Sequence, residues 1–122
     1  MIKEKIINLT QHDASEEQNL AGVFDLTPAG KTKVRELLTF KKIPTVLEMH
    51  RRTRALVEIA DATAADFAMI GGAPFFMGAL EEALCRADIM PLYAFSRRVA
   101  EEKPDGTKTS VFRHAGFVEV KR

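Results

Sequence analysis

The chain has 122 residues, of which 46% are hydrophobic and 29% are charged, as is typical of a single globular domain over residues 1–122. Eighteen Lys and Arg residues against seventeen Asp and Glu residues give a formal charge of +1, which excludes a histone-like polycation. We therefore expect no long nucleic acid as a partner. A lone Cys85, no signal-peptide pattern and no apolar run of about 20 residues lead us to expect a cytoplasmic protein with no membrane partner.

The first half of the chain predicts strands alternating with helices. Thr27-Pro28 and Pro44-Thr45 mark two helix starts, because Thr caps a helix and Pro suits its first positions. The expected elements are a strand over residues 5–9, a short helix ending near 21, a strand over 23–26, and helices over about 28–40 and 45–60.

The second half continues this alternation and then changes to hairpin-like sequence. The expected elements are a strand over 66–70, a helix over 74–87, a strand over 89–95 that runs on through Val99, a turn over 103–107, and short strands over 110–114 and 117–120 around Gly116. We therefore predict a Rossmann-like α/β sandwich with a parallel core sheet and an antiparallel C-terminal hairpin.

Polar or glycine-rich segments follow three of the predicted parallel strands. These segments are Thr10, Gln11 and His12; Gly71, Gly72 and Ala73; and Ser96, Arg97 and Arg98. Ligands of open α/β sheets bind at the carboxyl ends of the strands. We expect the three segments to share one rim.

Each segment has a structural as well as a functional interpretation. Gly71 and Gly72 could let backbone N–H groups approach a phosphate, or could simply form a tight strand-to-helix turn. His12 could position a ribose hydroxyl or move a proton, or the segment around it could cap the next helix.

The arginines are candidates for phosphate contacts. Alternation along a strand places Ser96 and Arg98 on one face and Arg97 on the other, and one arginine could hold a phosphate with two hydrogen bonds. Arg113 is a weaker candidate. Such charges also protect exposed strand edges.

Metal-ligand spacings and nucleophile motifs do not occur in the sequence, and we expect no metal or other cofactor. An enzyme built from these residues would act by orientation and electrostatics.

Two stretches of the chain resemble a known family. The opening Ile7–His12 (INLTQH) with Ser15–Gln18 (SEEQ), and the ending Leu92–Val99 (LYAFSRRV) with Val111–Phe117 (VFRHAGF), are similar to the small stand-alone CRISPR-associated Csx proteins related to the CARF domain. The order of elements agrees along nearly the whole chain.

This resemblance implies a homodimeric ring nuclease with a CARF-like fold. It would bind a cyclic oligoadenylate messenger of type III CRISPR defence and cut it without metal, through attack of a ribose 2′-hydroxyl that leaves a 2′,3′-cyclic phosphate. His12, Ser96 and Arg97 would then be catalytic, and the ligand would contact the residues Thr10, Gln11, Gly71, Gly72, Ala73, Arg98 and Arg113.

Two other functions use the same residues. One is a non-catalytic binder of the messenger, either a sponge or a regulatory module, and it predicts tight binding without products. The other is a nucleotide-binding domain outside CRISPR biology, which predicts no preference for cyclic over linear adenylates.

Overall fold

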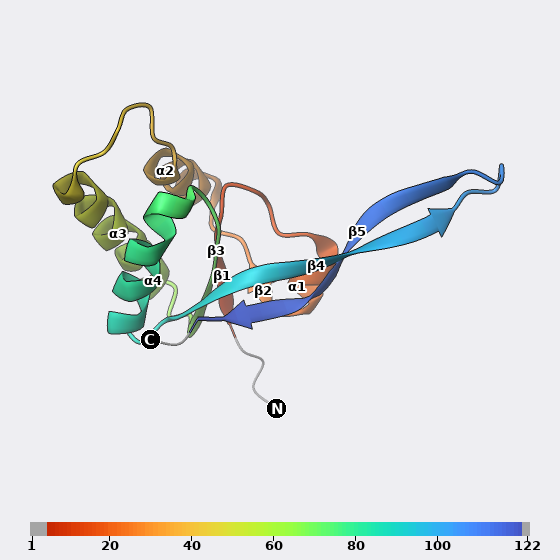
Figure 1. Cartoon of the computed structure of the whole chain (residues 1–122). Helices are drawn as coiled ribbons and strands as arrows, with labels where there is room; N and C mark the ends of the chain where they lie inside the picture. The colour runs from red at the N-terminus through yellow and green to blue at the C-terminus, as the bar shows by residue number, and fades with distance from the viewer. Residues whose placement is uncertain (1–4, 121–122) are drawn as a thin grey trace.

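The computed structural model describes residues 5–120, which form five strands and four helices (Figure 1). In chain order these are β1 (Ile6–Leu9), α1 (Glu16–Leu20), β2 (Val23–Phe24), α2 (Pro28–Leu38), α3 (Val46–Asp61), β3 (Phe67–Ile70), α4 (Pro74–Arg86), β4 (Met90–Glu102) and β5 (Lys108–Glu119). The chain is an α/β protein, as the sequence predicts.

The five strands form one sheet in the order β2-β1-β3-β4-β5. The first four run parallel, and β5 runs antiparallel to β4. Leu9 pairs with Ile70, so β1 and β3 end at the same level. The loops that follow these two strands therefore begin side by side, at the carboxyl edge where ligands of such sheets bind.

The two faces of the sheet are covered unequally. Helices α2, α3 and α4 pack on one face, and the short α1 lies on the other (Figure 1). The larger core includes the fully buried side chains of Ile7, Leu9, Leu56, Phe76, Leu80 and Leu84. Ile6, Met69 and Leu92 form a smaller core on the α1 side. Alternate residues of β1 therefore face opposite cores. This explains why its apolar residues do not alternate with polar ones.

The helix starts confirm the capping signals in the sequence. The side chains of Thr27 and Thr45 accept hydrogen bonds from the backbone N–H groups of Gly30 and Glu48, and Pro28 occupies the first turn of α2. Ser15 and Gln18 form a reciprocal capping box at α1. These contacts satisfy donors that a helix start otherwise leaves unpaired.

The hairpin is longer than the sequence predicts. β4 and β5 pair from Leu92 to Glu102, and the outer part of the pair, residues 96–114, projects from the body as a two-stranded ribbon that we call the hairpin arm (Figure 1). The two short strands expected over residues 110–120 are one strand. Gly116, with φ of +152°, lies next to a register irregularity opposite Phe95 and Ser96, so it bends the ribbon without ending it.

Within residues 5–120, none of the helices combines the length and apolar character needed to cross a membrane.

Candidate functional site

The loop after β1 is built around the buried side chain of Asn8. Its Nδ2 donates to the backbone oxygen of His12 at 2.7 Å and to Oδ1 of Asp25 at 2.8 Å. Its Oδ1 accepts from the backbone N–H of Thr10 at 2.9 Å and from the Thr10 hydroxyl at 2.6 Å. One buried amide thus fixes both ends of the Thr10–His12 loop, and it is satisfied on both sides as burial requires.

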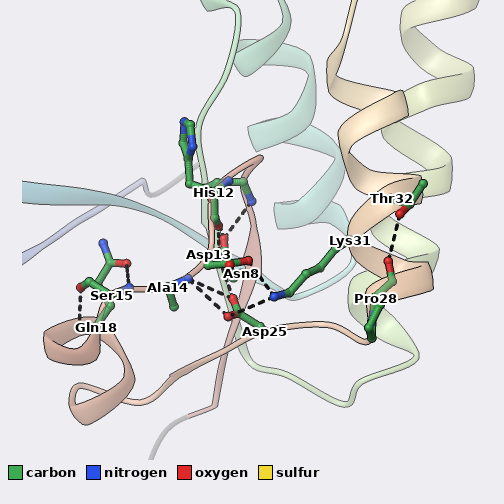
Figure 2. A network of polar contacts seen from close by, with 11 residues as sticks. Asn8, His12, Asp13, Ala14, Ser15, Gln18, Asp25, Pro28, Lys31 and Thr32 are labelled. Atoms are coloured by element: carbon green, nitrogen blue, oxygen red, sulfur yellow. Dashed lines mark hydrogen bonds and ion pairs between the residues drawn. The ribbon is translucent and has the colours of Figure 1, made fainter.

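Asp25 and Lys31 extend this network to the next elements (Figure 2). Asp25 accepts from the backbone N–H of Ala14, at 3.1 Å to Oδ1, and its Oδ2 lies 3.6 Å from Nζ of Lys31. The same ammonium group is 2.7 Å from Oδ1 of Asp13. The loop after β1 is thereby tied to the segment after β2 and to α2, so its backbone is held in one arrangement.

The Asp13–Lys31 ion pair gives the loop a pH dependence that can be measured. The hydrogen bond from Lys31 lowers the pKa of Asp13 below 3.8, and the same bond raises the pKa of Lys31. The ion pair contributes fully to stability at pH values above the usual carboxyl pKa. This contribution is lost as the pH falls through the lowered pKa of Asp13. We expect Lys31→Met to raise the pKa of Asp13 towards 3.8, measured by NMR titration of the carboxyl carbon.

The matched control for this titration is Lys33→Met, which removes an equal charge from an exposed position on the same helix. Lys33→Met should leave the pKa of Asp13 unchanged. An equal effect of both substitutions would mean that overall charge, not the contact, lowers the pKa.

The turn between β3 and α4 forms the other side of the site. Gly72 has φ of +155°, and a Cβ there would lie 3.3 Å from Cε of Met77. A Cβ at Gly71 would lie 3.7 Å from Cγ2 of Thr10, an ordinary contact. The two turns are thus adjacent. Ala73 is the N-cap of α4 and supplies no side-chain hydrogen bond.

The two glycines predict different responses to substitution. Gly72→Ala should lower the free energy of unfolding by about 1–2 kcal/mol, because alanine is strained at that φ. Gly71→Ala should change it by less than about 0.5 kcal/mol. Urea denaturation of both variants checks this, and equal losses would contradict the assignment of strain to Gly72.

A pocket of about 540 Å³, which we call the rim pocket, joins the two turns. Its lining comes from both turns, from the start of α1 and from the ends of β3 and β4: Thr10, Gln11, His12, Asp13, Ser15, Gln18, Met69, Ile70, Gly71, Gly72 and Ala94. The imidazole of His12 is exposed and points away from the Asn8–Asp25 network (Figure 2). The pocket therefore offers neutral hydrogen-bonding groups, backbone, one histidine and the Asp13 carboxylate, which is paired with Lys31.

A family model described as "Uncharacterized protein MJ1673 family" matches residues 4–118, nearly the whole chain. The chain belongs to the MJ1673 family. No curated protein and no solved structure matches it. The MJ1673 match includes every residue that lines the rim pocket and the whole hairpin arm.

In this MJ1673 chain, two of the three predicted segments meet in the rim pocket. Thr10, Gln11, His12, Gly71 and Gly72 all line it, whereas Ala73 does not. The expectation that the third segment shares this rim is wrong, because β4 does not end with its neighbours. Its pairing with β3 stops at Leu92, and the strand continues to Glu102.

The third segment lies instead on the hairpin arm. The pocket reaches β4 at Ala94, and Ser96, two residues further, follows on the same strand face by alternation. Arg98 comes next on that face, with its guanidinium 5.3 Å from the ring centre of Phe112, and Arg97 falls on the other face. Arg113 forms ion pairs with Glu101 and, at 3.9 Å, with Glu17. Roles for these four residues stay predictions.

Sequence reasoning did not assign Asn8, Asp25 or the first residues of α1 to the site. Asn8 is the one polar residue in an otherwise apolar strand, which is the signal that could have identified it. Nothing local marks Asp25, which bonds Asn8 across 17 residues. Ser15 and Gln18 line the pocket although their capping box already uses part of their hydrogen-bonding capacity.

Proposed function

We propose that this protein is a CARF-like, Rossmann-like domain that binds a cyclic oligoadenylate in the rim pocket and cuts it. The observation that supports this most is the convergence of Thr10, Gln11 and His12 with the Gly71-Gly72 turn in one pocket. Its volume lies within the range of about 300–1,000 Å³ that is usual for small-molecule sites.

The chemistry of an adenylate suits this lining. Adenine and ribose present donors and acceptors that neutral side chains such as Thr10 and Gln11 can bind. A phosphate needs N–H groups or cations, and α4, with 13 residues, begins directly after the glycine turn. Its cap Ala73 supplies no side-chain acceptor, Pro74 has no N–H, and the Phe76 N–H donates to the Ala73 oxygen at 3.0 Å, so in this first turn a phosphate would depend on the Phe75 N–H.

Cleavage needs no nucleophile from the protein. The ribose 2′-oxygen forms a bond to the phosphorus of its own 3′-phosphate, and the bond from phosphorus to the 5′-oxygen breaks. The proton that leaves the 2′-hydroxyl is balanced by one gained at the 5′-oxygen, so the ring opens to a 2′,3′-cyclic phosphate and a 5′-hydroxyl. We assign one proton transfer to His12, and to Ser96 and Arg98 the orientation of the phosphate.

A second candidate is a binder that does not cut, and one observation favours it. Asp13 also lines the pocket, but its carboxylate is held by Lys31 at 2.7 Å. Among residues 5–120 this leaves His12 as the lining group that is free to act as acid or base. A single such group fits recognition more simply than it fits two proton transfers.

The deciding experiment incubates the protein with cyclic tri-, tetra- and hexa-adenylate in EDTA and separates the products by chromatography and mass spectrometry. Cyclic-phosphate ends support the nuclease, and an intact ring bound to the protein supports the binder. No binding of any ring overturns both. His12→Gln should abolish product and keep binding, whereas His50→Gln on α3 should change neither.

The two neighbouring arginines should differ in their effect on ligand affinity. Arg98 lies on the face of β4 that continues from the pocket, so Arg98→Ala should weaken binding by about 10- to 100-fold, the effect of one charged hydrogen bond. Arg97→Ala on the other face is the matched control and should change binding less than about 3-fold. Isothermal titration calorimetry measures both. The reverse order would contradict this placement of the pocket.

A further inference from the structure

We propose that the ligand of the rim pocket extends onto the hairpin arm, where Phe112 and His114 contact one of its adenine bases. This contact rests on the proposed function, because it concerns the same cyclic adenylate. A pocket of about 540 Å³ suits one ligand of drug size, and a single nucleotide already has that size. Even cyclic tri-adenylate repeats the nucleotide three times. Much of the ligand therefore has to lie outside the rim pocket.

One face of the hairpin arm begins in the rim pocket, which reaches β4 at Ala94. The cross-strand pairs that share this face are, outwards from the pocket, Ala94 with Phe117, Ser96 with His114, and Arg98 with Phe112. The register irregularity beside Ser96 keeps this alignment, because the ring centroids of His114 and Phe117 lie only 4.8 Å apart. A ligand that leaves the pocket along β4 therefore meets His114 and then Phe112.

His114 has hydrogen-bonding capacity that the chain does not use. Its Nδ1 is the one buried side-chain nitrogen or oxygen without a hydrogen-bond partner among residues 5–120, and its Nε2 makes no hydrogen bond in that range either. Buried polar groups are normally partnered, so this exception needs an explanation. Packing against Phe117 positions the imidazole, and its nitrogens stay unpaired until a ligand binds. The edge of adenine and the ribose hydroxyls offer the donors and acceptors that an imidazole can bind.

Phe112 and Arg98 provide what a stacked nucleotide needs. Phe112 is 67% exposed, and the Arg98 guanidinium lies 5.3 Å from its ring centre. Arg98 makes no ion pair or hydrogen bond with another residue in the range 5–120. Exposed aromatic rings beside cations bind single-stranded nucleotides, with the ring against the base and the cation near the phosphate. Further out this face continues with the small residues Ala100 and Ser110, so it lacks the larger apolar patch of a protein interface.

A tryptophan on the arm reports directly on this contact, because the natural chain contains none. The Phe112→Trp variant keeps a stacking ring, and we expect its emission to be quenched when cyclic tri-, tetra- or hexa-adenylate binds. The matched control is Phe95→Trp, since Phe95 is 55% exposed and lies on the opposite face of β4. The emission of the control should stay constant. Calorimetric titration of the same samples shows whether the cyclic adenylate binds.

Three further substitutions separate stacking from hydrogen bonding. Phe112→Ala should weaken binding of the cyclic adenylate by at least about 10-fold, as the loss of a base stack does, whereas Phe112→Tyr should bind like the wild type. His114→Phe keeps a ring against Phe117 and removes both nitrogens, so it should weaken binding by about 10-fold. Phe95→Ala is the control and should change binding by less than about 3-fold. Circular dichroism checks that each variant is folded.

Failure of this contact and failure of the proposed function give different results. If no cyclic adenylate binds the wild type, both are wrong. If one binds, constant emission of the Phe112→Trp variant, or wild-type affinity of the folded Phe112→Ala and His114→Phe variants, overturns the contact on the arm and leaves the proposed function in place. An equal loss of affinity in Phe95→Ala also overturns it, because the effect would then come from the arm as a whole.

Discussion

Asn8→Ala should lower the free energy of unfolding by about 2–3 kcal/mol, because it leaves several polar groups of the loop after β1 without their buried partner. Those groups are the backbone N–H and hydroxyl of Thr10, the backbone oxygen of His12 and Oδ1 of Asp25. Urea denaturation should show a lower midpoint with an unchanged slope. Since Thr10 and His12 line the rim pocket, any ligand bound there should lose affinity as well.

The control for this prediction is Asn19→Ala on α1, which removes the same side chain at an exposed position. It should change stability by less than about 0.5 kcal/mol. A loss at Asn8 no greater than at Asn19 would mean that the loop does not depend on the buried amide.

Phe76→Ala should cost about 3–5 kcal/mol, the largest effect that we expect from a single side chain in this protein. Phe76 is fully buried in the core between the helices and the sheet. Truncation removes its contacts and leaves a cavity that the surrounding strands and helices can fill only in part. Thermal and urea unfolding both measure the loss.

Its neighbour Phe75 provides a close comparison. Both rings contact Phe40 edge to face, with centroid distances of 5.0 Å for Phe75 and 5.1 Å for Phe76, but Phe75 is 57% exposed. Phe75→Ala should therefore cost about 1 kcal/mol or less, and the difference between the two variants isolates burial from the aromatic contact. Similar losses would show that the contact with Phe40 dominates.

The local signals in the sequence predicted most of the fold. Capping residues placed the helix starts at Thr27 and Thr45, and the apolar run before Gly71 placed a buried strand. Half of the candidate site followed from the same signals, because loops after neighbouring parallel strands necessarily meet. These features depend on residues that are close together along the chain.

The features that the sequence did not predict depend on distant pairing. The end of β3, more than twenty residues earlier, decides where β4 leaves the sheet, and this places Ser96 and the arginines on the hairpin arm, beyond the lining of the pocket. Gly116 suggested a break, yet the pairing of β5 with β4 continues past it. The bond from Asn8 to Asp25 likewise requires β1 and β2 to be neighbours first.

The unequal edges of the sheet also limit how large an assembly can become. β2, at one edge, has two residues, whereas β5, at the other, has twelve. A sheet can grow into a filament only if both edges accept new strands, and an edge of two residues offers almost no template. Edge-to-edge pairing through β5 could therefore join two chains but could not continue from the short edge of β2.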